Sequence, residues 1–194
     1  MTRPVRNPDP FFFGYGSLVN RKTHDYPTAL PARARGWRRV WRHTSRRPAA
    51  FLSVREAPGH QIEGLVAAVP SGDWAALDAR EAAYDRLPLA APDVAHDHPH
   101  PITVSIYRTS PAHEAPEAAH PILLSYLDCV VQGFLHVFGE AGADRFFETT
   151  DGWDGTILDD RAAPRYPRHV DLTAFERDFV DDRLARLPAR IIRG

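Results

Sequence analysis

The segment EGLVAAVP, residues 63–70, constrains the fold more than any other part of this 194-residue sequence. It is almost entirely apolar and carries a glycine near its start and a proline at its end, as expected for a central β-strand covered on both faces. Strand-forming composition recurs in four further segments, at residues 10–15, 32–45, 49–56 and 102–110. Gly36 is expected to form a bulge in the second of these, and Pro58-Gly59 to end the third.

In the remaining segments the apolar residues recur with the period of a helix. Helices are predicted at residues 73–87, 121–139, 143–150 and 172–187. Pro121 suits the first turn of the second helix, Gly139 suits its end, and Asp171 or Thr173 can begin the last one. The order of strands, one helix, a further strand and then helices predicts a mixed α+β protein rather than a regular doubly wound sheet.

Length and composition are those of one ordinary globular domain spanning residues 1–194. The formal net charge of −1 does not indicate binding to nucleic acid or to a membrane surface. Cys129 is the only cysteine, which excludes an internal disulfide and a cysteine-based metal site. The basic residues 1–8 are not followed by a long apolar run, and no window reaches the ~18 apolar residues of a membrane span. We therefore expect a cytoplasmic protein without nucleic-acid or membrane partners.

The first strand ends in a glycine-rich turn, Gly14-Tyr15-Gly16-Ser17-Leu18. In such a turn between a strand and a helix, consecutive backbone N–H groups can converge on a carboxylate or a phosphate. Three familiar motifs do not fit. The dinucleotide fingerprint lacks its third glycine, a P-loop lacks its Gly-Lys-Ser/Thr, and no glycine follows Ser17 as a nucleophile elbow requires. The turn is thus either an anion-binding loop or a plain connection from strand to helix.

Glu81 is the candidate for acid–base chemistry. At 100° per residue, the predicted helix places four residues on one face: Trp74, Leu77, Glu81 and Tyr84. A carboxylate among such side chains is partly desolvated, which raises its pKa towards the range useful to a general base. The other interpretation is a buried glutamate that an arginine neutralises and that has only a structural role.

The segment from Arg33 to Arg47 contains seven arginines interleaved with tryptophans. A nucleic-acid stripe is one interpretation, but a half-buried strand with arginines on its outer face also explains the pattern, and one arginine of the run can face a pocket. The histidines of residues 96–100 could bind a metal ion, yet the surrounding prolines favour a solvated loop. In the second predicted helix, Tyr126 and Cys129 are expected at or near the core, and no nearby basic residue activates Cys129 as a nucleophile.

Together these elements resemble the γ-glutamylcyclotransferase-like family, which includes the ChaC-type enzymes. FGYGSL closes the first strand and EGLVAAVP follows about fifty residues later. LDAREAAYDR comes next and is similar to the family's Leu-Asp-x-x-Glu…Tyr-x-Arg segment. Tyr126 lies in a later helix where the family often has a pocket tyrosine. The resemblance covers residues 10–135, and residues 140–194 are expected to form a helical extension. The turn is more similar to that of the ChaC-type subgroup. The Gly-Gly-Tyr of the glutathione-specific members is absent, however, so the resemblance does not identify the substrate.

The resemblance implies a small, barrel-like mixed sheet with flanking helices. It also implies an enzyme that releases 5-oxoproline from γ-glutamyl amino acids, γ-glutamylamines or glutathione, with no metal or organic cofactor. Glu81 would be the general acid/base and the Gly14–Leu18 turn the anion-binding loop. The residues implied in substrate binding are Tyr15, Gly16, Ser17, Leu18, Tyr84 and Tyr126. The only partner expected is a small γ-glutamyl compound.

The reaction places few demands on the protein. Because the α-amine of the substrate attacks its own γ-carbonyl, the enzyme need supply only geometry and proton transfers. The alternative to an enzyme is a binding module of the same fold that holds a γ-glutamyl ligand without turnover.

Overall fold

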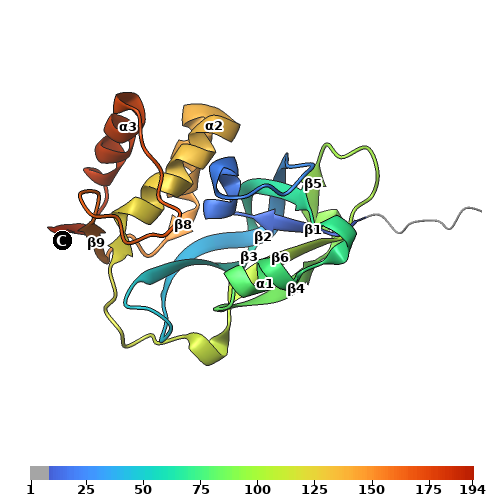
Figure 1. The fold of residues 1–194 in the computed structure, drawn as a ribbon, viewed down its shortest axis with the longest axis horizontal. Coiled ribbons are helices and arrows are strands. Elements are labelled where there is room, and N and C mark those ends of the chain that lie inside the picture. The colour runs from blue at the N-terminus through green and yellow to red at the C-terminus, as the bar shows by residue number, and fades with distance from the viewer. Residues whose placement is uncertain (1–8) are drawn as a thin grey trace, which may run out of the picture.

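A computed structural model of the chain describes residues 9–194 (Figure 1). Its strands are β1 Phe11–Gly14, β2 Leu30–His43, β3 Ala50–Ala68, β4 Tyr84–Leu89, β5 Val94–His96, β6 Val104–Thr109, β7 Ile122–Leu123, β8 Thr150–Asp151, β9 Thr156–Asp159 and β10 Arg190–Arg193. Its α-helices are α1 Ala75–Arg80, α2 Leu124–Glu148 and α3 Ala174–Leu184. The single-turn 3-10 helices are η1 Ser17–Val19, η2 Arg21–Thr23, η3 Pro70–Gly72, η4 Ala91–Asp93 and η5 Pro111–His113.

The interpretation of residues 1–8 lies outside the described part of the chain. Within residues 9–194, no helix combines the length and the hydropathy needed to cross a lipid bilayer.

Seven strands form one mixed sheet in the order β4-β6-β1-β3-β2-β5, with β8 paired to β2. The β1–β6 and β2–β8 pairs are parallel and the others are antiparallel. The sheet curls into a half-barrel with helices beside it (Figure 1). This confirms the predicted α+β class with a barrel-like mixed sheet and flanking helices. The apolar segment 63–70 falls largely in β3, between β1 and β2, and its residues there are buried, as predicted for a central strand.

β2 and β3 form a long antiparallel hairpin that contains one irregularity. The register shifts at Gly36, which lies opposite residues 57–60 of β3. Gly36 and Gly59 both have a φ of 81°, in the left-handed region that glycine adopts without strain. The bulge predicted at Gly36 is confirmed. The strand end predicted at Pro58-Gly59 is wrong, because pairing with β2 resumes beyond it and β3 continues as one strand.

The helix predicted over residues 73–87 is wrong in its second half, because α1 ends at Arg80. The Glu81 N–H still donates to the Leu77 carbonyl at 2.9 Å, and the chain then turns into β4. β4 pairs with β6 along its whole length, and these inter-strand hydrogen bonds override the helical propensity of the segment. The helical face predicted for four residues therefore does not form: Trp74, Leu77, Glu81 and Tyr84.

The helices predicted at residues 121–139 and 143–150 form one interrupted helix, α2. Gly139, with a φ of 66°, breaks the helix at the position where the sequence predicts an end. The start of the helix is wrong by a few residues, because Ile122–Leu123 forms β7 and pairs with β9.

Residues 140–194 contribute strands as well as helices. β9 lies between β7 and β10 in a three-stranded parallel sheet, and β8 joins the main sheet. α3 begins at Thr173, one of the two predicted starts, with a capping box in which Thr173 and Glu176 bond reciprocally. The short strands lack a sequence signal of their own, because each is only two to four residues long.

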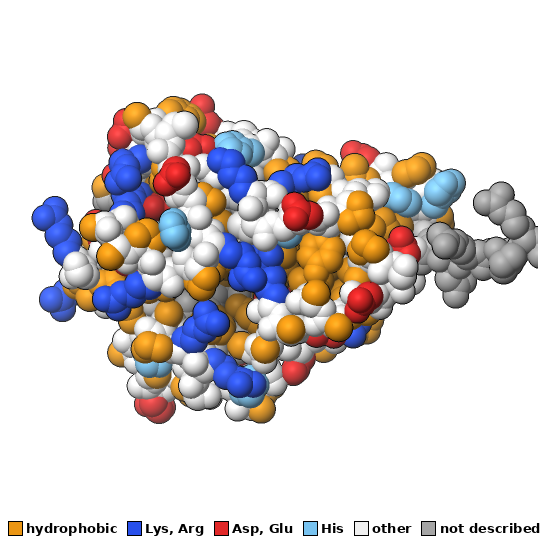
Figure 2. Space-filling view, in the orientation of Figure 1, with side chains coloured by type: hydrophobic (Ala, Val, Ile, Leu, Met, Phe, Trp, Pro, Cys, Tyr) orange, Lys and Arg blue, Asp and Glu red, His pale blue; other side chains and the backbone are white. Residues whose placement is uncertain are grey.

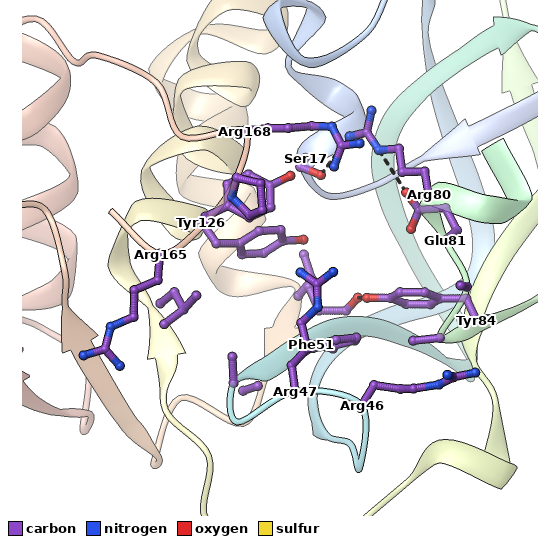
Figure 3. Close-up of a pocket in the computed structure, with 18 of the residues that line it drawn as sticks. Ser17, Arg46, Arg47, Phe51, Arg80, Glu81, Tyr84, Tyr126, Arg165 and Arg168 are labelled. Carbon is purple, nitrogen blue, oxygen red and sulfur yellow. Dashed lines mark hydrogen bonds and ion pairs between the residues drawn. The ribbon is translucent and has the colours of Figure 1, made fainter. Parts of the chain in front are cut away.

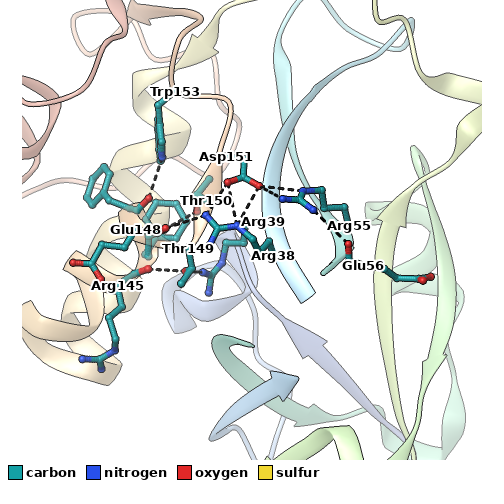
Figure 4. A network of polar contacts seen from close by, with 12 residues as sticks. Arg38, Arg39, Arg55, Glu56, Arg145, Glu148, Thr149, Thr150, Asp151 and Trp153 are labelled. Carbon is teal, nitrogen blue, oxygen red and sulfur yellow. Dashed lines mark hydrogen bonds and ion pairs between the residues drawn. The ribbon is translucent and has the colours of Figure 1, made fainter. Parts of the chain in front are cut away.

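Ion pairs fix β8 to the main sheet (Figure 4). Asp151 accepts hydrogen bonds from Arg38 of β2 at 2.7 Å and from Arg55 of β3 at 2.8 Å. The two guanidinium groups lower the pKa of Asp151. The chain that leaves α2 is therefore held against the β2–β3 hairpin.

Arg39 departs from the predicted pattern of outward arginines, since its side chain is fully buried. It donates hydrogen bonds to the Tyr15 carbonyl at 2.9 Å, to the Thr149 hydroxyl at 2.7 Å and to the Glu63 carbonyl. Two phenylalanine rings of α2 lie against its guanidinium. Burial lowers the pKa of Arg39 to about 9, so the group stays charged at neutral pH. Arg39 thereby joins the turn after β1 to the end of α2.

Candidate active site

A cavity of about 510 Å³ opens beside the turn after β1. Five parts of the chain line it: η1, the β2–β3 connection with the start of β3, the end of α1 with the following turn, the start of α2, and residues 165–168. Figure 2 shows basic side chains gathered around a hollow near the middle of this face. One carboxylate, Glu81, and five arginines line the cavity: Arg46, Arg47, Arg80, Arg165 and Arg168. The cavity is therefore strongly cationic.

Glu81 caps the C-terminal end of α1 and faces the cavity (Figure 3). Its side chain is 16% exposed, and Arg80 Nε lies 3.2 Å from its Oε1. Burial raises the pKa of Glu81 above its usual value, while the positive charges of Arg80 and Arg168 oppose that rise. Raising the pKa of a carboxylate in this way makes it better suited both to accept and to return a proton.

Arg80 connects this acid to the segment that follows β1. Its Nη1 donates to the Thr23 carbonyl at 2.9 Å, and its Nη2 lies 3.3 Å from Ser17 Oγ. The Arg80 side chain is only 9% exposed, so this arrangement is packed rather than loose. Glu81 therefore has both the arginine partner of the structural interpretation and the access to a cavity that chemistry requires.

Close contacts explain why two positions of the Gly14–Leu18 turn are glycines. A Cβ atom at Gly16 would lie 2.8 Å from the Tyr126 hydroxyl, and one at Gly14 would lie 2.6 Å from the Leu18 Cβ. Within the described chain, the N–H groups of Gly16, Ser17 and Leu18 donate no hydrogen bond. Ser17 lines the cavity, so this end of the turn offers polar groups to a ligand.

Four of the predicted site residues line the cavity: Ser17, Glu81, Tyr84 and Tyr126. Tyr15, Gly16 and Leu18 are not among the lining residues. Tyr15 is buried in the core and its hydroxyl donates to the Tyr107 carbonyl at 2.6 Å. Leu18 packs in a core cluster with Leu77 of α1. The structure thus brings the acid, one residue of the turn and two tyrosines together.

The two lining tyrosines are held by the cavity walls. The Tyr84 hydroxyl donates to the Leu52 carbonyl at 2.9 Å, and its ring stacks on that of Phe51. Tyr126 packs edge-on against Tyr166, with ring centroids 4.9 Å apart. Burial raises the pKa of Tyr84 and of Tyr126 well above the usual value, so both hydroxyls are protonated at neutral pH.

Residues 165–168 form a wall of the cavity that the sequence predicts only as part of an extended link. Asp160, which is buried, anchors this segment to the start of α2. Its carboxylate accepts hydrogen bonds from Ser125 N–H at 2.8 Å, from Ser125 Oγ at 2.6 Å and from Arg165 N–H at 2.9 Å. No local pattern could have shown this, because the anchoring partner lies on a distant helix.

The arginine run at residues 33–47 has mixed surroundings. Its last two members, Arg46 and Arg47, line the cavity, so an arginine of this run does face a pocket. Arg39 is buried, and three others pair with acids: Arg33 with Glu63, Arg38 with Asp151 and Arg42 with Glu114. The run therefore does not form one exposed basic stripe.

Two other candidates play no part in the cavity. Burial raises the pKa of the Cys129 thiol to about 12, so the group is protonated and not a nucleophile at neutral pH. His98 packs edge-on against Phe11. Nowhere in residues 9–194 do three or more His, Cys, Asp or Glu side chains come together as a metal site.

A family model described as "Gamma-glutamyl cyclotransferase, AIG2-like" matches residues 12–125. Ser17 and Glu81 lie within the matched part, and residues 165–168 lie outside it. No protein with a curated description matches the sequence.

Several solved structures have the same fold. One titled "Gamma-glutamyl cyclotransferase" is 14% identical, and the alignment covers 90% of this chain and 99% of that one with a TM-score of 0.57. An uncharacterized protein from Homo sapiens is 14% identical over the same shares, with a TM-score of 0.58. YkqA from Bacillus subtilis is 18% identical over 76% of this chain and 57% of its own, with a TM-score of 0.54. At such identities the likeness concerns the fold.

Proposed function

The chain belongs to the γ-glutamyl cyclotransferase, AIG2-like family, and on this premise we propose that it cyclises the γ-glutamyl group of a small substrate to 5-oxoproline. The observation that carries the proposal is the position of Glu81. Among the lining residues in the described part of the chain it is the only carboxylate, it is partly desolvated, and it shares the cavity with Ser17 of the glycine turn.

The turn and its neighbours bind the α-carboxylate of the γ-glutamyl group. The N–H group of Ser17, the residue of the turn that lines the cavity, has no partner among the described residues, and Arg168 extends toward this side of the cavity (Figure 3). Backbone N–H groups and a guanidinium together suit a carboxylate. Binding there brings the adjacent α-ammonium group close to Glu81.

Glu81 carries the proton transfers. Its carboxylate takes a proton from the α-ammonium, and the free amine then attacks the γ-carbonyl carbon to form the new C–N bond of a five-membered ring. The protonated Glu81 next donates to the nitrogen of the departing amine as the original amide bond breaks. The new ring nitrogen still carries one proton more than the lactam, and this proton passes to the departing amine, so the products are 5-oxoproline and the amine in its ammonium form, with Glu81 ionised again. The raised pKa of Glu81 suits both directions of transfer.

Tyr126 is the candidate donor to the oxygen of the reacting carbonyl. Its hydroxyl donates no hydrogen bond to another residue of the described chain, and it lines the same cavity as Glu81. Negative charge develops on the γ-carbonyl oxygen when the amine attacks, and a fixed O–H donor stabilises that charge more than it stabilises the neutral carbonyl.

The experiment is an assay of 5-oxoproline by chromatography, with γ-glutamyl-alanine and glutathione as substrates and a protein-free blank for spontaneous cyclisation. Glu81→Gln should lower kcat/KM by ~10²–10⁴-fold, as loss of a general acid/base does. Asp85→Asn is the matched control, because Asp85 is an exposed acid on the neighbouring strand β4, and it should leave the rate unchanged.

Circular dichroism of both variants shows whether the fold persists. Full activity in Glu81→Gln would contradict the mechanism. Calorimetric binding of γ-glutamyl-alanine with no product from any γ-glutamyl compound would instead support the alternative of a binding module without turnover.

A further inference from the structure

Three guanidinium groups of the cavity have no partner in the described chain, and one of them, on Arg165, points away from Glu81 in Figure 3. Arg47 and Arg168 form no hydrogen bond and no ion pair with any of residues 9–194, and both side chains line the cavity. Figure 3 shows them on opposite sides: Arg168 runs toward Ser17 and Arg80, while Arg47 rises from the β2–β3 connection into the cavity. Unpaired cations held in one cavity indicate a ligand that carries more than one negative charge.

Only one of these cations is accounted for by the γ-glutamyl group. That group has a single carboxylate, which the proposed function places beside Ser17 and Arg168. Arg47 lies across the cavity from this position, next to the ring of Phe51 (Figure 3). The part of the substrate that reaches Arg47 is the departing amine, since the remainder of the γ-glutamyl group is held near Glu81.

We infer that the departing amine carries a carboxylate, and that Arg47 binds it. This rests on the proposed function. The substrate class is then γ-glutamyl amino acids and peptides, rather than γ-glutamylamines with neutral or cationic leaving groups. Arg47 is a residue that determines specificity; it takes no part in the proton transfers.

The cavity wall next to Arg47 suits a leaving amine that carries a carboxylate. Ala49, Ala50, Phe51 and Leu52 line the cavity next to Arg47, so aliphatic atoms between the scissile nitrogen and the carboxylate would meet an apolar wall. The planar guanidinium can form two parallel hydrogen bonds with the carboxylate. Arg46 also lines this rim, but its side chain points away in Figure 3 and its Nη2 lies 2.8 Å from His113 Nε2.

The test compares γ-glutamyl-alanine with γ-glutamyl-alaninamide, which differ in the charge of the leaving group and hardly in shape. In the unmodified protein, kcat/KM for 5-oxoproline formation should be about tenfold to a hundredfold higher for the acid. The difference should lie mainly in KM, because a carboxylate remote from the reacting atoms is bound equally in the ground state and the transition state.

Arg47→Gln should reduce kcat/KM for the acid to near that of the amide and leave the amide rate unchanged. Arg46→Gln, the neighbour on the same loop, should keep the preference. Arg47 is exposed, so its replacement is not expected to disturb folding. Equal rates for the two compounds in the unmodified protein, or an unchanged preference in Arg47→Gln, would overturn the inference while the proposed function stood. No product from either compound would overturn the proposed function itself, and this inference with it.

Discussion

The cavity lies between two regions of the chain: both contribute arginines and tyrosines to it, but of the described lining residues only those of the first region include a carboxylate. Residues 11–123 supply the glycine turn, Arg47 and Glu81, and nearly all of this region is covered by the family model. Residues 124–193 supply Tyr126 and the wall at 165–168. Glu81, the proposed proton-transfer group, thus belongs to the part that the family model matches. Arg168, one of the charges around it, belongs to a segment that Asp160 anchors to α2. Glu81 and Arg168 therefore come from different parts of the sequence, whereas Ser17 and Arg47 lie in the same region as Glu81.

The largest expected effect on stability comes from Arg39, which joins the two regions. Replacing it by methionine keeps the unbranched stem of the side chain but removes the guanidinium, which donates to two buried carbonyls, those of Tyr15 and Glu63, and to the partly buried Thr149 hydroxyl. Leaving them unsatisfied should lower the free energy of unfolding by about 2–4 kcal/mol. A denaturant titration followed by tryptophan fluorescence measures this loss.

Arg35→Met is the control for Arg39→Met. Arg35 is exposed on the same strand, so its replacement should change the free energy of unfolding by less than about 0.5 kcal/mol. If Arg39→Met were as mild as this control, the turn and the end of α2 would be held together by other contacts.

A smaller effect is expected at the anchor of the second region. Asp160→Asn replaces an oxygen that accepts from Ser125 or Arg165 by an N–H₂ donor, which should cost about 1–3 kcal/mol of stability. The wall at 165–168 would then be held less firmly, so KM should rise more than kcat falls. Calorimetric melting and steady-state kinetics measure the two consequences.

The control for this anchor is Asp154→Asn, which changes an exposed acid of the preceding turn and should leave both quantities unchanged. A destabilised Asp160→Asn protein with an unaltered KM would mean that residues 165–168 keep their place without the anchor, and that the second region tolerates movement near the site.

The sequence predicts those parts of the fold whose signal is contiguous. The apolar run at 63–70, the bulge at Gly36 and the capping residue Thr173 are each recognisable from a few neighbouring letters, and each is found where predicted. Ser17 and Glu81 are far apart in the sequence, but the resemblance to the family implied that they meet, and both line one cavity.

The parts that the sequence does not predict depend on distant partners. AREAAYDRL has helical composition, but pairing with β6 makes its second half a strand. Arg39 looks like its exposed neighbours on β2, and only the acceptors around it distinguish it. The wall at 165–168 has no pattern of its own, because Asp160 and Ser125 meet only in the folded chain.

The smallest expected effect, on pH dependence, tests whether the second region acts on the acid of the first. Glu81 must be ionised to accept a proton from the substrate, so kcat/KM should fall as the pH drops through its pKa. Burial raises that pKa and the charge of Arg168 opposes the rise. Arg168→Gln should therefore raise the pKa of Glu81 further and move the acidic limb of the kcat/KM profile to higher pH. The quantity to compare is the midpoint of the acidic limb, because the loss of a binding group also lowers the plateau of kcat/KM.

Arg165→Gln is the control for this prediction. It removes a charge that points away from Glu81 in Figure 3 and should leave the midpoint unchanged. An unmoved midpoint in Arg168→Gln would show that the charges of the second region bind substrate without tuning the acid, and a shift to lower pH would reverse the sign of the interaction inferred between them.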